Sequence, residues 1–380
     1  MLLRILSVLC CLIWLYLLLG RGLFWQIRRN VIGRASATDL DRRSVVAIIP
    51  ARDEADVIGI AVRSLLAQSL QPPLHIFVVD DASTDNTALV AAAAAASHPG
   101  RLTVVASQPL PAGWTGKLWA LSQGIEAAQK LDPDYFLLTD ADILHQEHSV
   151  RDLLAVAVEH NCDLASLMVK LRCDSFAERA LIPPFIFFFL QLYPPAWTAD
   201  PVSRTAGAAG GCILIRPCAL QNLGGFYAIR NAVIDDCTLA SAVKGRKGRL
   251  WMGLTQEAAS IRSYPSALAI GKMISRSAFS QLDHSVWILA ATVVGMTLTY
   301  IMPPIGLLWG STSTKALCIC AWLLMTIVYL PTVRFYGSRW MWSLSLPFVA
   351  VFYLLATLHS AIAYWRGRGG VWKGRTQDRR

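Results

Sequence analysis

Short apolar runs alternate with longer, helix-like stretches between residues 45 and 260 of the chain. The runs "VVAIIP", "HIFVVDD", "LTVVAS" and "YFLLTDAD" have the length of buried strands, and the segments 55–69, 88–97 and 117–130 between them have the length of helices. Strands that alternate with helices in this way predict a parallel α/β sheet with helices on both faces. We therefore expect one sizeable α/β domain over residues 44–265.

Several other apolar stretches are long enough to lie in a membrane. Residues 5–20 carry no charge, and we expect an N-terminal transmembrane anchor over residues 1–24. The segments 286–309, 316–333 and 341–365 lack Asp, Glu, Lys and Arg, so each is a candidate membrane helix. The expected organisation is completed by a basic juxtamembrane linker at 25–43, an amphipathic linker at 266–285, a membrane region at 286–365 and a basic tail at 366–380.

The number of crossings is constrained by the basic residues beside them. Three C-terminal spans would place the basic tail on the side opposite the arginine-rich linker, against the positive-inside tendency. We therefore expect the segment with Pro303 and Pro304 not to cross. The apolar stretch 181–197 either dips into the membrane interface or forms a buried core helix, because a full span would separate the aspartates on its two sides.

Composition supports a membrane protein. Of 380 residues, 54 % are hydrophobic and 16 % are charged, and the mean hydropathy is +0.45. The net charge of +10 is concentrated beside the apolar runs, which indicates cytoplasmic anchoring and contact with anionic lipid, not nucleic-acid binding. The nine cysteines form no CxxC pair and show no metal-binding or disulfide spacing.

Paired aspartates end three of the apolar runs. They are Asp80 and Asp81, Asp140 and Asp142, and Asp235 and Asp236. In an open α/β sheet the ligand crevice lies beyond the carboxyl ends of the strands, where the first two pairs fall. A short acidic pair suits Mg²⁺ or Mn²⁺ carrying a diphosphate, and solvated strand ends with capping aspartates are the alternative.

Other nucleotide-binding and phosphate-handling folds are excluded by missing motifs. No GxGxxG precedes the "VVDD" run and no GxxxxGK[ST] occurs, so the sequence is neither a dinucleotide-binding fold nor a P-loop ATPase. Leu144 stands where a DxDx[TV] phosphatase has Thr or Val.

The ordered segments "VVAIIPARDEADVIGIAVRSLLAQ", "VVDDASTDNT", "GWTGKLWALSQG", "LLTDADI", "AAGGCILIRP" and "VIDDCTLA" resemble a family 2 glycosyltransferase with the GT-A fold. The whole organisation is similar to that of the bacterial hopene-associated membrane glycosyltransferases of hopanoid biosynthesis. The resemblance implies a GT-A nucleotide-diphospho-sugar transferase domain with one N-terminal and two to three C-terminal transmembrane helices. It also implies the bacterial inner (cytoplasmic) membrane, with the catalytic domain in the cytoplasm.

The resemblance assigns roles to residues at the matching positions. Asp236 would be the catalytic base, with Asp235 beside it to raise its pKa. Asp142 and Asp140 would hold Mg²⁺ or Mn²⁺, and Gly210 and Gly211 would lie on the acceptor side. The nucleotide sugar would meet Pro50, Arg52, Glu54, Asp81, Lys117 and Asp140.

The implied function is inverting, metal-dependent transfer of a single sugar from a nucleotide-sugar donor, in the first instance a UDP-sugar, to a lipid acceptor such as a hopanoid. The Gln-x-x-Arg-Trp motif of processive synthases is missing, which argues against polymerisation. Asp53 departs from the Asn common in the family. The alternatives are transfer to polyprenyl phosphate or a carotenoid, a nucleotidyltransferase of similar fold, and a non-enzymatic membrane protein with a degenerate nucleotide-binding domain.

Overall fold

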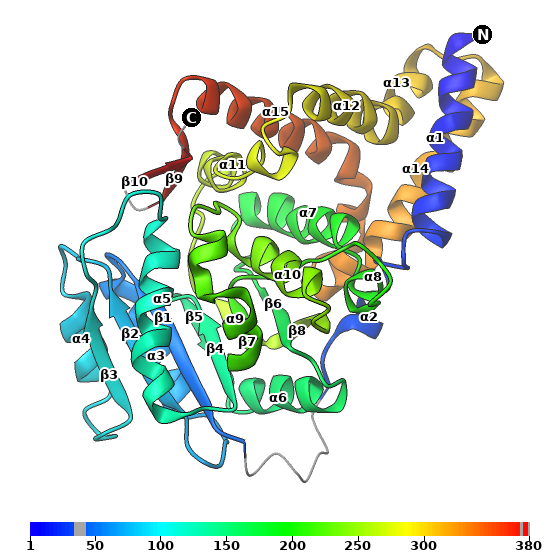
Figure 1. Cartoon of the computed structure of the whole chain (residues 1–380). Helices are drawn as coiled ribbons and strands as arrows, with labels where there is room; N and C mark the ends of the chain where they lie inside the picture. Colours follow the sequence, from blue (N-terminus) through cyan, green and yellow to red (C-terminus); the bar gives the residue numbers. More distant parts are fainter. Residues whose placement is uncertain (34–42, 373–374, 379–380) are drawn as a thin grey trace.

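The computed structural model describes residues 1–33, 43–372 and 375–378 (Figure 1). The expected basic linker and basic tail therefore lie partly outside the described residues. A mixed eight-stranded sheet forms the centre of the α/β domain, in the order β3-β2-β1-β4-β7-β6-β8-β5. The strands are β1 Val45–Ala51, β2 His75–Asp80, β3 Leu102–Ala106, β4 Tyr135–Thr139, β5 Ile143–His145, β6 Leu164–Lys170, β7 Cys212–Ile215 and β8 Leu250–Ser260.

The four strands expected from the sequence are parallel, as predicted, but the complete sheet is mixed. β3, β2, β1 and β4 are parallel, but β7 runs antiparallel to β4 and β6, and β5 antiparallel to β8. After β6 the chain leaves the sheet at its carboxyl edge, passes through α7 and α8, and returns at the same edge, so β7 must run the other way. Consequently Gly210 and Gly211, which precede β7, lie at the same edge as Asp140, which follows β4.

Helices cover both faces of this sheet because the buried strands alternate their side chains between two cores. In β1, Ala47 and Ile49 pack toward α3 and α6, whereas Val46 and Ile48 pack toward α5 and α10. The helices of the domain are α3 Ala55–Leu66, α4 Thr87–Ala94, α5 Gly116–Ala128, α6 Ser149–Glu159, α9 Pro217–Leu223 and α10 Asp235–Gly245.

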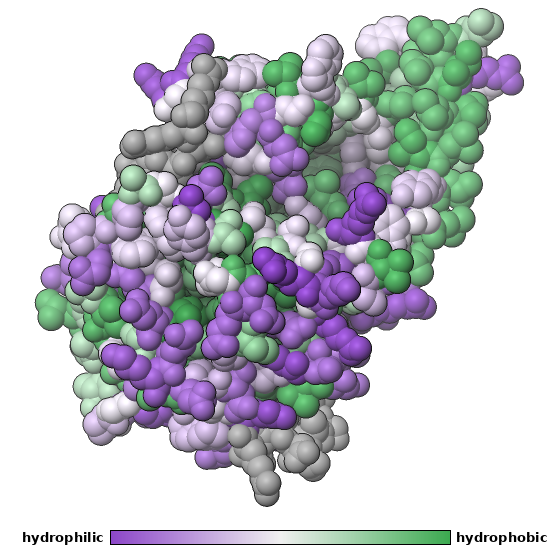
Figure 2. All heavy atoms as spheres, viewed as in Figure 1, coloured by the Kyte–Doolittle hydropathy of each residue, from purple (hydrophilic) through white to green (hydrophobic). Residues whose placement is uncertain are grey.

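Apolar helices pack beside and above the domain, and among the described residues five are long and apolar enough to cross a membrane. Figure 2 shows their hydrophobic surface gathered over α1 and its neighbours at the upper right. Trp287, Trp309 and Trp340, at ends of these helices, are exposed, as in interfacial aromatic belts. The elements are α1 Leu2–Leu19, α2 Ile27–Asn30, α7 Phe176–Leu192, α8 Pro195–Ala199, α11 Ala267–Ser275, α12 Val286–Met296, α13 Met302–Trp309, α14 Thr312–Phe335 and α15 Leu346–Trp365, followed by the hairpin β9 Gly369–Trp372 and β10 Arg375–Asp378.

Helix α7 connects the soluble domain to the apolar helices. It begins at Ser175, whose side chain and that of Glu178 form a capping box, and the same Glu178 carboxylate accepts a hydrogen bond from the backbone N–H of Tyr264. Its buried face contacts α14 and α15: the ring of Phe187 lies 5.1 Å from that of Tyr329, and the Tyr353 hydroxyl donates to a carbonyl of α7. The stretch expected at 181–197 is thus half buried between the two parts of the protein.

A π-helical turn, Thr297–Ile301, joins α12 to α13. Pro303 has no N–H, so it cannot bond the carbonyl of Thr299 four residues earlier. The indole N–H of Trp14 on α1 donates to that carbonyl at 2.8 Å. Trp14 is fully buried, so this bond joins the first helix of the chain to the C-terminal helices.

Replacing Trp14 by Phe should lower the free energy of unfolding by about 1 kcal/mol, because the Thr299 carbonyl loses the indole N–H and keeps only the weaker bond from the Cys10 thiol at 3.5 Å. Thermal unfolding in detergent micelles measures the change. Trp340→Phe is the control, since Trp340 is 60 % exposed. Equal unfolding midpoints for the two variants would contradict the role given to the indole.

Candidate active site

The loops after β1 and β2 meet through Arg52 and Asp81. Asp81 is only 2 % exposed, and its backbone carbonyl and carboxylate both face the Arg52 guanidinium, with 3.8 Å between Nη1 and Oδ2. The Nε atom of Arg52 is buried and makes no hydrogen bond with any described residue. Asp80 has a different role, because its carboxylate caps the turn at Ser83.

Asp53 occupies a left-handed backbone conformation, with φ of 50°. Asn and Asp tolerate this conformation better than other residues with a side chain. The Asp53 carboxylate accepts hydrogen bonds from the backbone N–H and the hydroxyl of Thr84, which an Asn carbonyl would also accept. The departure from the common Asn therefore leaves the geometry of this loop intact.

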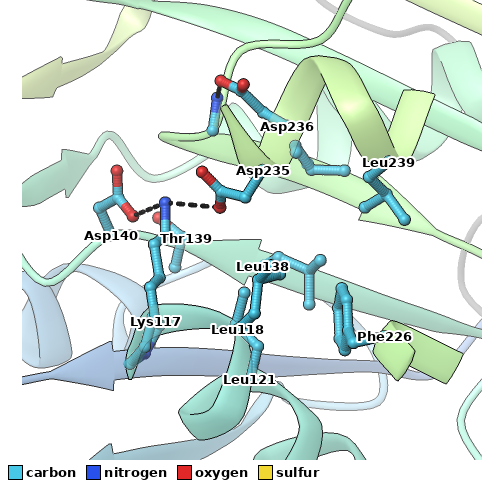
Figure 3. Close-up of a pocket in the computed structure, with 13 residues that line it drawn as sticks. Lys117, Leu118, Leu121, Leu138, Thr139, Asp140, Phe226, Asp235, Asp236 and Leu239 are labelled. Carbon is cyan, nitrogen blue, oxygen red and sulfur yellow. Dashed lines mark hydrogen bonds and ion pairs between the residues drawn. The ribbon is translucent and has the colours of Figure 1, made fainter. Parts of the chain in front are cut away.

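Lys117 joins two acidic segments that are far apart in the sequence. It lies in the first turn of α5, and its ammonium group is 2.9 Å from Asp140 and 3.1 Å from Asp235, as Figure 3 shows. Burial alone would lower the pKa of Lys117, but the two carboxylates raise it above its ordinary value, so the ammonium stays charged. Burial raises the pKa of Asp140, and Lys117 opposes that shift.

Asp236 lies in the first turn of α10 and accepts two backbone hydrogen bonds. The N–H groups of Gly210 and Cys237 each donate to its carboxylate at 2.7 Å. Burial and the neighbouring charge of Asp235 nevertheless raise the pKa of Asp236 to about 6, against the lowering effect of Lys117 and the two hydrogen bonds. A carboxylate with a pKa near neutrality is suited to accept a proton from a hydroxyl group.

Asp142 and Glu54 are joined by Arg262, which sequence reasoning missed. The Arg262 Nε donates to Asp142 at 2.9 Å, and its Nη2 donates to both oxygens of Glu54 at 2.7 and 2.9 Å. Asp142 also accepts from the hydroxyl of Ser260 at 3.0 Å. The available signal was the group of three cations, at 262, 272 and 276, that follows the last strand of the domain.

A cavity of about 480 Å³ brings most of the expected site residues together. Its lining also includes three cations, namely Arg262, which is paired with Asp142 and Glu54, and Lys272 and Arg276. Arg52 and Asp81 are not part of this lining. The expected residues that line the cavity are Pro50, Glu54, Lys117, Asp140, Asp142, Gly210, Gly211, Asp235 and Asp236.

The donor atoms suit a hard divalent cation only in part. No group of three or more His, Cys, Asp or Glu within the described ranges is arranged to hold a metal ion. Mg²⁺ needs only one or two protein carboxylates when phosphate oxygens and water complete its shell, and Asp140 and Asp142 meet that requirement. An ion at this position would compete with Lys117 and Arg262 for the same oxygens.

Comparisons with known proteins bear on the fold of this domain. Residues 46–213 match the family described as "Glycosyl transferase family 2". The fold is similar to that of the mannosyltransferase PcManGT from Pyrobaculum calidifontis, solved in complex with GDP-Man and Mn²⁺, with a TM-score of 0.58, 17 % identity and coverage of 94 % of this chain and 99 % of that one.

Two further solved structures are less similar. One is glucosyl-3-phosphoglycerate synthase from Mycobacterium tuberculosis, with a TM-score of 0.42, 17 % identity and coverage of 67 % of this chain and 86 % of that one. The other is S. aureus TarS 1–349, with a TM-score of 0.41, 13 % identity and coverage of 87 % of this chain and 95 % of that one. No curated protein matches the chain significantly. The α/β domain has the GT-A fold, its residues 46–213 match the glycosyl transferase family 2, and these findings indicate a glycosyltransferase.

Replacing Gly210 by Ala should reduce the transfer rate while leaving the fold intact. A Cβ atom at this position would lie 3.1 Å from the Asp236 carboxylate, which must shift by a few tenths of an ångström, and 3.4 Å from the Lys117 ammonium, at the limit of ordinary contact. We expect a fall in kcat of about tenfold, because small displacements of reacting groups are costly. Gly245→Ala is the control, since a Cβ there meets no atom within 4 Å. Equal kcat values for the two variants would show that the contact has no effect.

Proposed function

We propose that this protein transfers a single sugar, with inversion, from a nucleotide-sugar donor to a hydroxyl group of a membrane lipid. The observation that supports the lipid acceptor is a second cavity, of about 700 Å³, that begins at Asp235 and Asp236 and extends among the apolar helices. A cavity that joins an acidic base to apolar helices suits an acceptor with a hydrocarbon body and a reactive hydroxyl.

The walls of this apolar cavity come from the helices on the membrane side of the domain. Phe185, Phe188 and Phe189 of α7 line one side, and α12, the π-helical turn and α15 line the other. Two polar side chains of the lining bond to each other, because the Tyr300 hydroxyl donates a hydrogen bond to the Gln191 side chain at 2.6 Å. The lining is therefore largely apolar where a lipid body would lie, and its charged side chains are Arg21, Lys117, Asp140, Asp235, Asp236 and Arg276.

In the proposed reaction Asp236 accepts the proton of the acceptor hydroxyl, whose oxygen attacks the anomeric carbon from the face opposite the leaving nucleoside diphosphate. Asp235 and Lys117 set the charge beside this base, and Arg262, Lys272 and Arg276 offer positive charge to the diphosphate. Asp140 and Asp142 would hold Mg²⁺ or Mn²⁺, which supplies charge neutralisation to the diphosphate when bound. The donor is a UDP-sugar or, as in the solved mannosyltransferase, GDP-mannose.

The proposed topology keeps α7 on one side of the membrane. Asp140 precedes α7 and Asp235 follows it, yet both line the same cavity, so the helix returns the chain to the side from which it came. The arginines after α1 favour the cytoplasmic side of a bacterial inner membrane for the domain. A hopanoid has the required rigid apolar body, and polyprenyl phosphate and carotenoids are the competing acceptors.

The catalytic role of Asp236 predicts a pH dependence. The group acts as a base only when ionised, and its pKa is raised to about 6, so kcat should be constant above that pH and fall about tenfold per pH unit below it. Asp236→Asn should abolish transfer at every pH while nucleotide binding, measured by calorimetry, persists.

The matched control is Asp132→Asn, at an exposed turn on the opposite edge of the sheet, where Asn also tolerates the left-handed backbone (φ of 46°). This variant should keep the wild-type profile. Transfer by the Asp236→Asn protein at more than about a hundredth of the wild-type rate would remove Asp236 from the mechanism.

Filling the apolar cavity should block the acceptor without disturbing the donor. Gly295 of α12 lines the cavity, and a Cβ there meets no atom within 4 Å, so Gly295→Phe adds a ring to empty space and improves helix propensity. We expect KM for the lipid acceptor to rise at least about tenfold, because a benzyl group removes much of the space for the lipid body. The affinity for nucleotide should not change.

The control is Val294→Phe, which adds a similar ring to the outer face of the same helix, where Val294 is 66 % exposed. This variant should leave both KM for the lipid acceptor and the affinity for nucleotide unchanged. If Gly295→Phe raises KM for the acceptor no more than Val294→Phe does, the lipid does not bind in this cavity.

A further inference from the structure

A polar groove adjoins the apolar cavity at the proposed base. Its volume is about 1380 Å³, larger than the roughly 300–1,000 Å³ of typical small-molecule sites. The groove is bounded by residues 110–116, 204–206 and 231–234, by the second turn of α10, and by the segment 280–284. None of these segments was expected to take part in binding, apart from the start of α5.

The two cavities share a wall. Leu192, Tyr193, Ile234, Cys237 and Gln281 are among the residues that line both of them. Gln281 donates a hydrogen bond to the Tyr193 hydroxyl at 2.6 Å, and this pair joins the end of α7 to the segment after α11 across the boundary. Ile234 and Cys237 flank Asp235 and Asp236 in the sequence, and the two aspartates line the apolar cavity but not the groove, so the base lies beside the shared wall on the side of the apolar cavity.

The chemistry of the groove suits a neutral, hydroxyl-rich ligand. Its lining is rich in hydroxyl and amide groups, from Thr115, Thr205, Asn231, Thr238, Ser241, Ser280 and Gln281. Trp114 contributes an aromatic ring that packs edge-to-face with Trp119, with 5.1 Å between the ring centroids. Tyr364 stacks on His284, with 4.1 Å between the ring centroids. Aromatic faces combined with hydrogen-bonding groups bind polyhydroxylated molecules, which have both apolar C–H faces and hydroxyl edges.

Charge argues against a phosphate in this groove. Its lining includes one arginine, Arg204, and one aspartate, Asp283, whose opposite charges cancel in the sum. The cations Lys117, Arg262, Lys272 and Arg276 instead line the donor cavity, where the nucleoside diphosphate needs them. A phosphate in the polar groove would meet a single Lys or Arg side chain of the lining, Arg204, because Lys117 and Arg276 line the donor and apolar cavities and not the groove.

We propose that the acceptor is an amphiphile with a neutral polyhydroxylated head group, a carbohydrate or polyol, which binds in the polar groove while its apolar body occupies the cavity among α7, α12 and α15. The inference rests on the proposed transfer to a lipid and specifies the head group. The hydroxyl that reacts is the one that the groove places at Asp236.

The test compares three probes with the same chain: n-dodecyl β-D-glucoside, 1-dodecanol and dodecyl phosphate. The full-length protein in nanodiscs is given each probe with Mn²⁺ and a panel of radiolabelled UDP-sugars and GDP-mannose, and the lipid products are separated. We expect the glucoside to have a KM at least about tenfold lower than that of the alcohol, because a site built to hydrogen-bond hydroxyl groups rejects an analogue that lacks them.

A variant that fills the groove assigns the preference to this site. Ser241 is exposed on α10 and lines the groove, so Ser241→Trp should raise KM for the glucoside about tenfold and leave KM for dodecanol unchanged. Asn222→Trp, at an exposed position on α9 that is absent from the lining of the groove, is the control and should behave as the wild type.

The outcomes separate this inference from the proposed function. Equal use of the glucoside and the alcohol, or preference for dodecyl phosphate, would overturn the head-group inference and leave transfer to a lipid standing. A glucoside preference that survives Ser241→Trp would also overturn it, because the groove would then not be its source. Transfer to none of the three probes would contradict the lipid acceptor and the head-group inference together.

Discussion

The two ion-pair clusters at the carboxyl edge of the sheet are the interaction on which the site depends. Asp140, Asp142, Asp235 and Glu54 come from segments that would repel one another if brought together alone. Lys117 compensates Asp140 and Asp235, and Arg262 compensates Asp142 and Glu54. Because each cation contacts two carboxylates, the loops after β1, β4 and β8 and the start of α10 are held around one cavity.

The apolar helices complete the site as well as providing attachment to a membrane. Helix α7 packs against the domain on one side and against α14 and α15 on the other, and the Arg21 guanidinium at the end of α1 donates to the Gln191 carbonyl of α7 at 3.0 Å. The carboxylate of Glu178 binds both the first turn of α7 and the backbone of Tyr264, two residues from Arg262. A change in the packing of the helices would therefore be transmitted to the charged groups of the site.

Three chemical environments meet at the start of α10. The donor cavity combines acids with a set of cations, the second cavity is apolar, and the third is polar with balanced charge. Asp236 lines the first two of these cavities, next to the wall that the third shares with the second, and its pKa is raised because it is shielded from water and adjoins another acid. A transfer reaction between a charged donor and an amphiphilic acceptor needs this separation of environments within a short distance.

The pattern of apolar and polar residues was enough to predict β1, β2, β3 and β4, the helices between them, the apolar helices and the acidic pairs. Burial and periodicity are local properties, so "VVAIIP" and "YFLLTDAD" could be identified as strands, and their carboxyl ends as the binding edge, without any tertiary information. The direction of β7 could not be predicted, because an apolar run such as "CILI" has the same pattern in a parallel and in an antiparallel strand. Two features emerge only from the fold: Arg262 contacts Asp142, which lies 120 residues earlier in the chain, and α7 lines both the donor cavity and the apolar cavity. Such contacts depend on the order of all eight strands and on how the apolar helices pack against them, which no local pattern encodes.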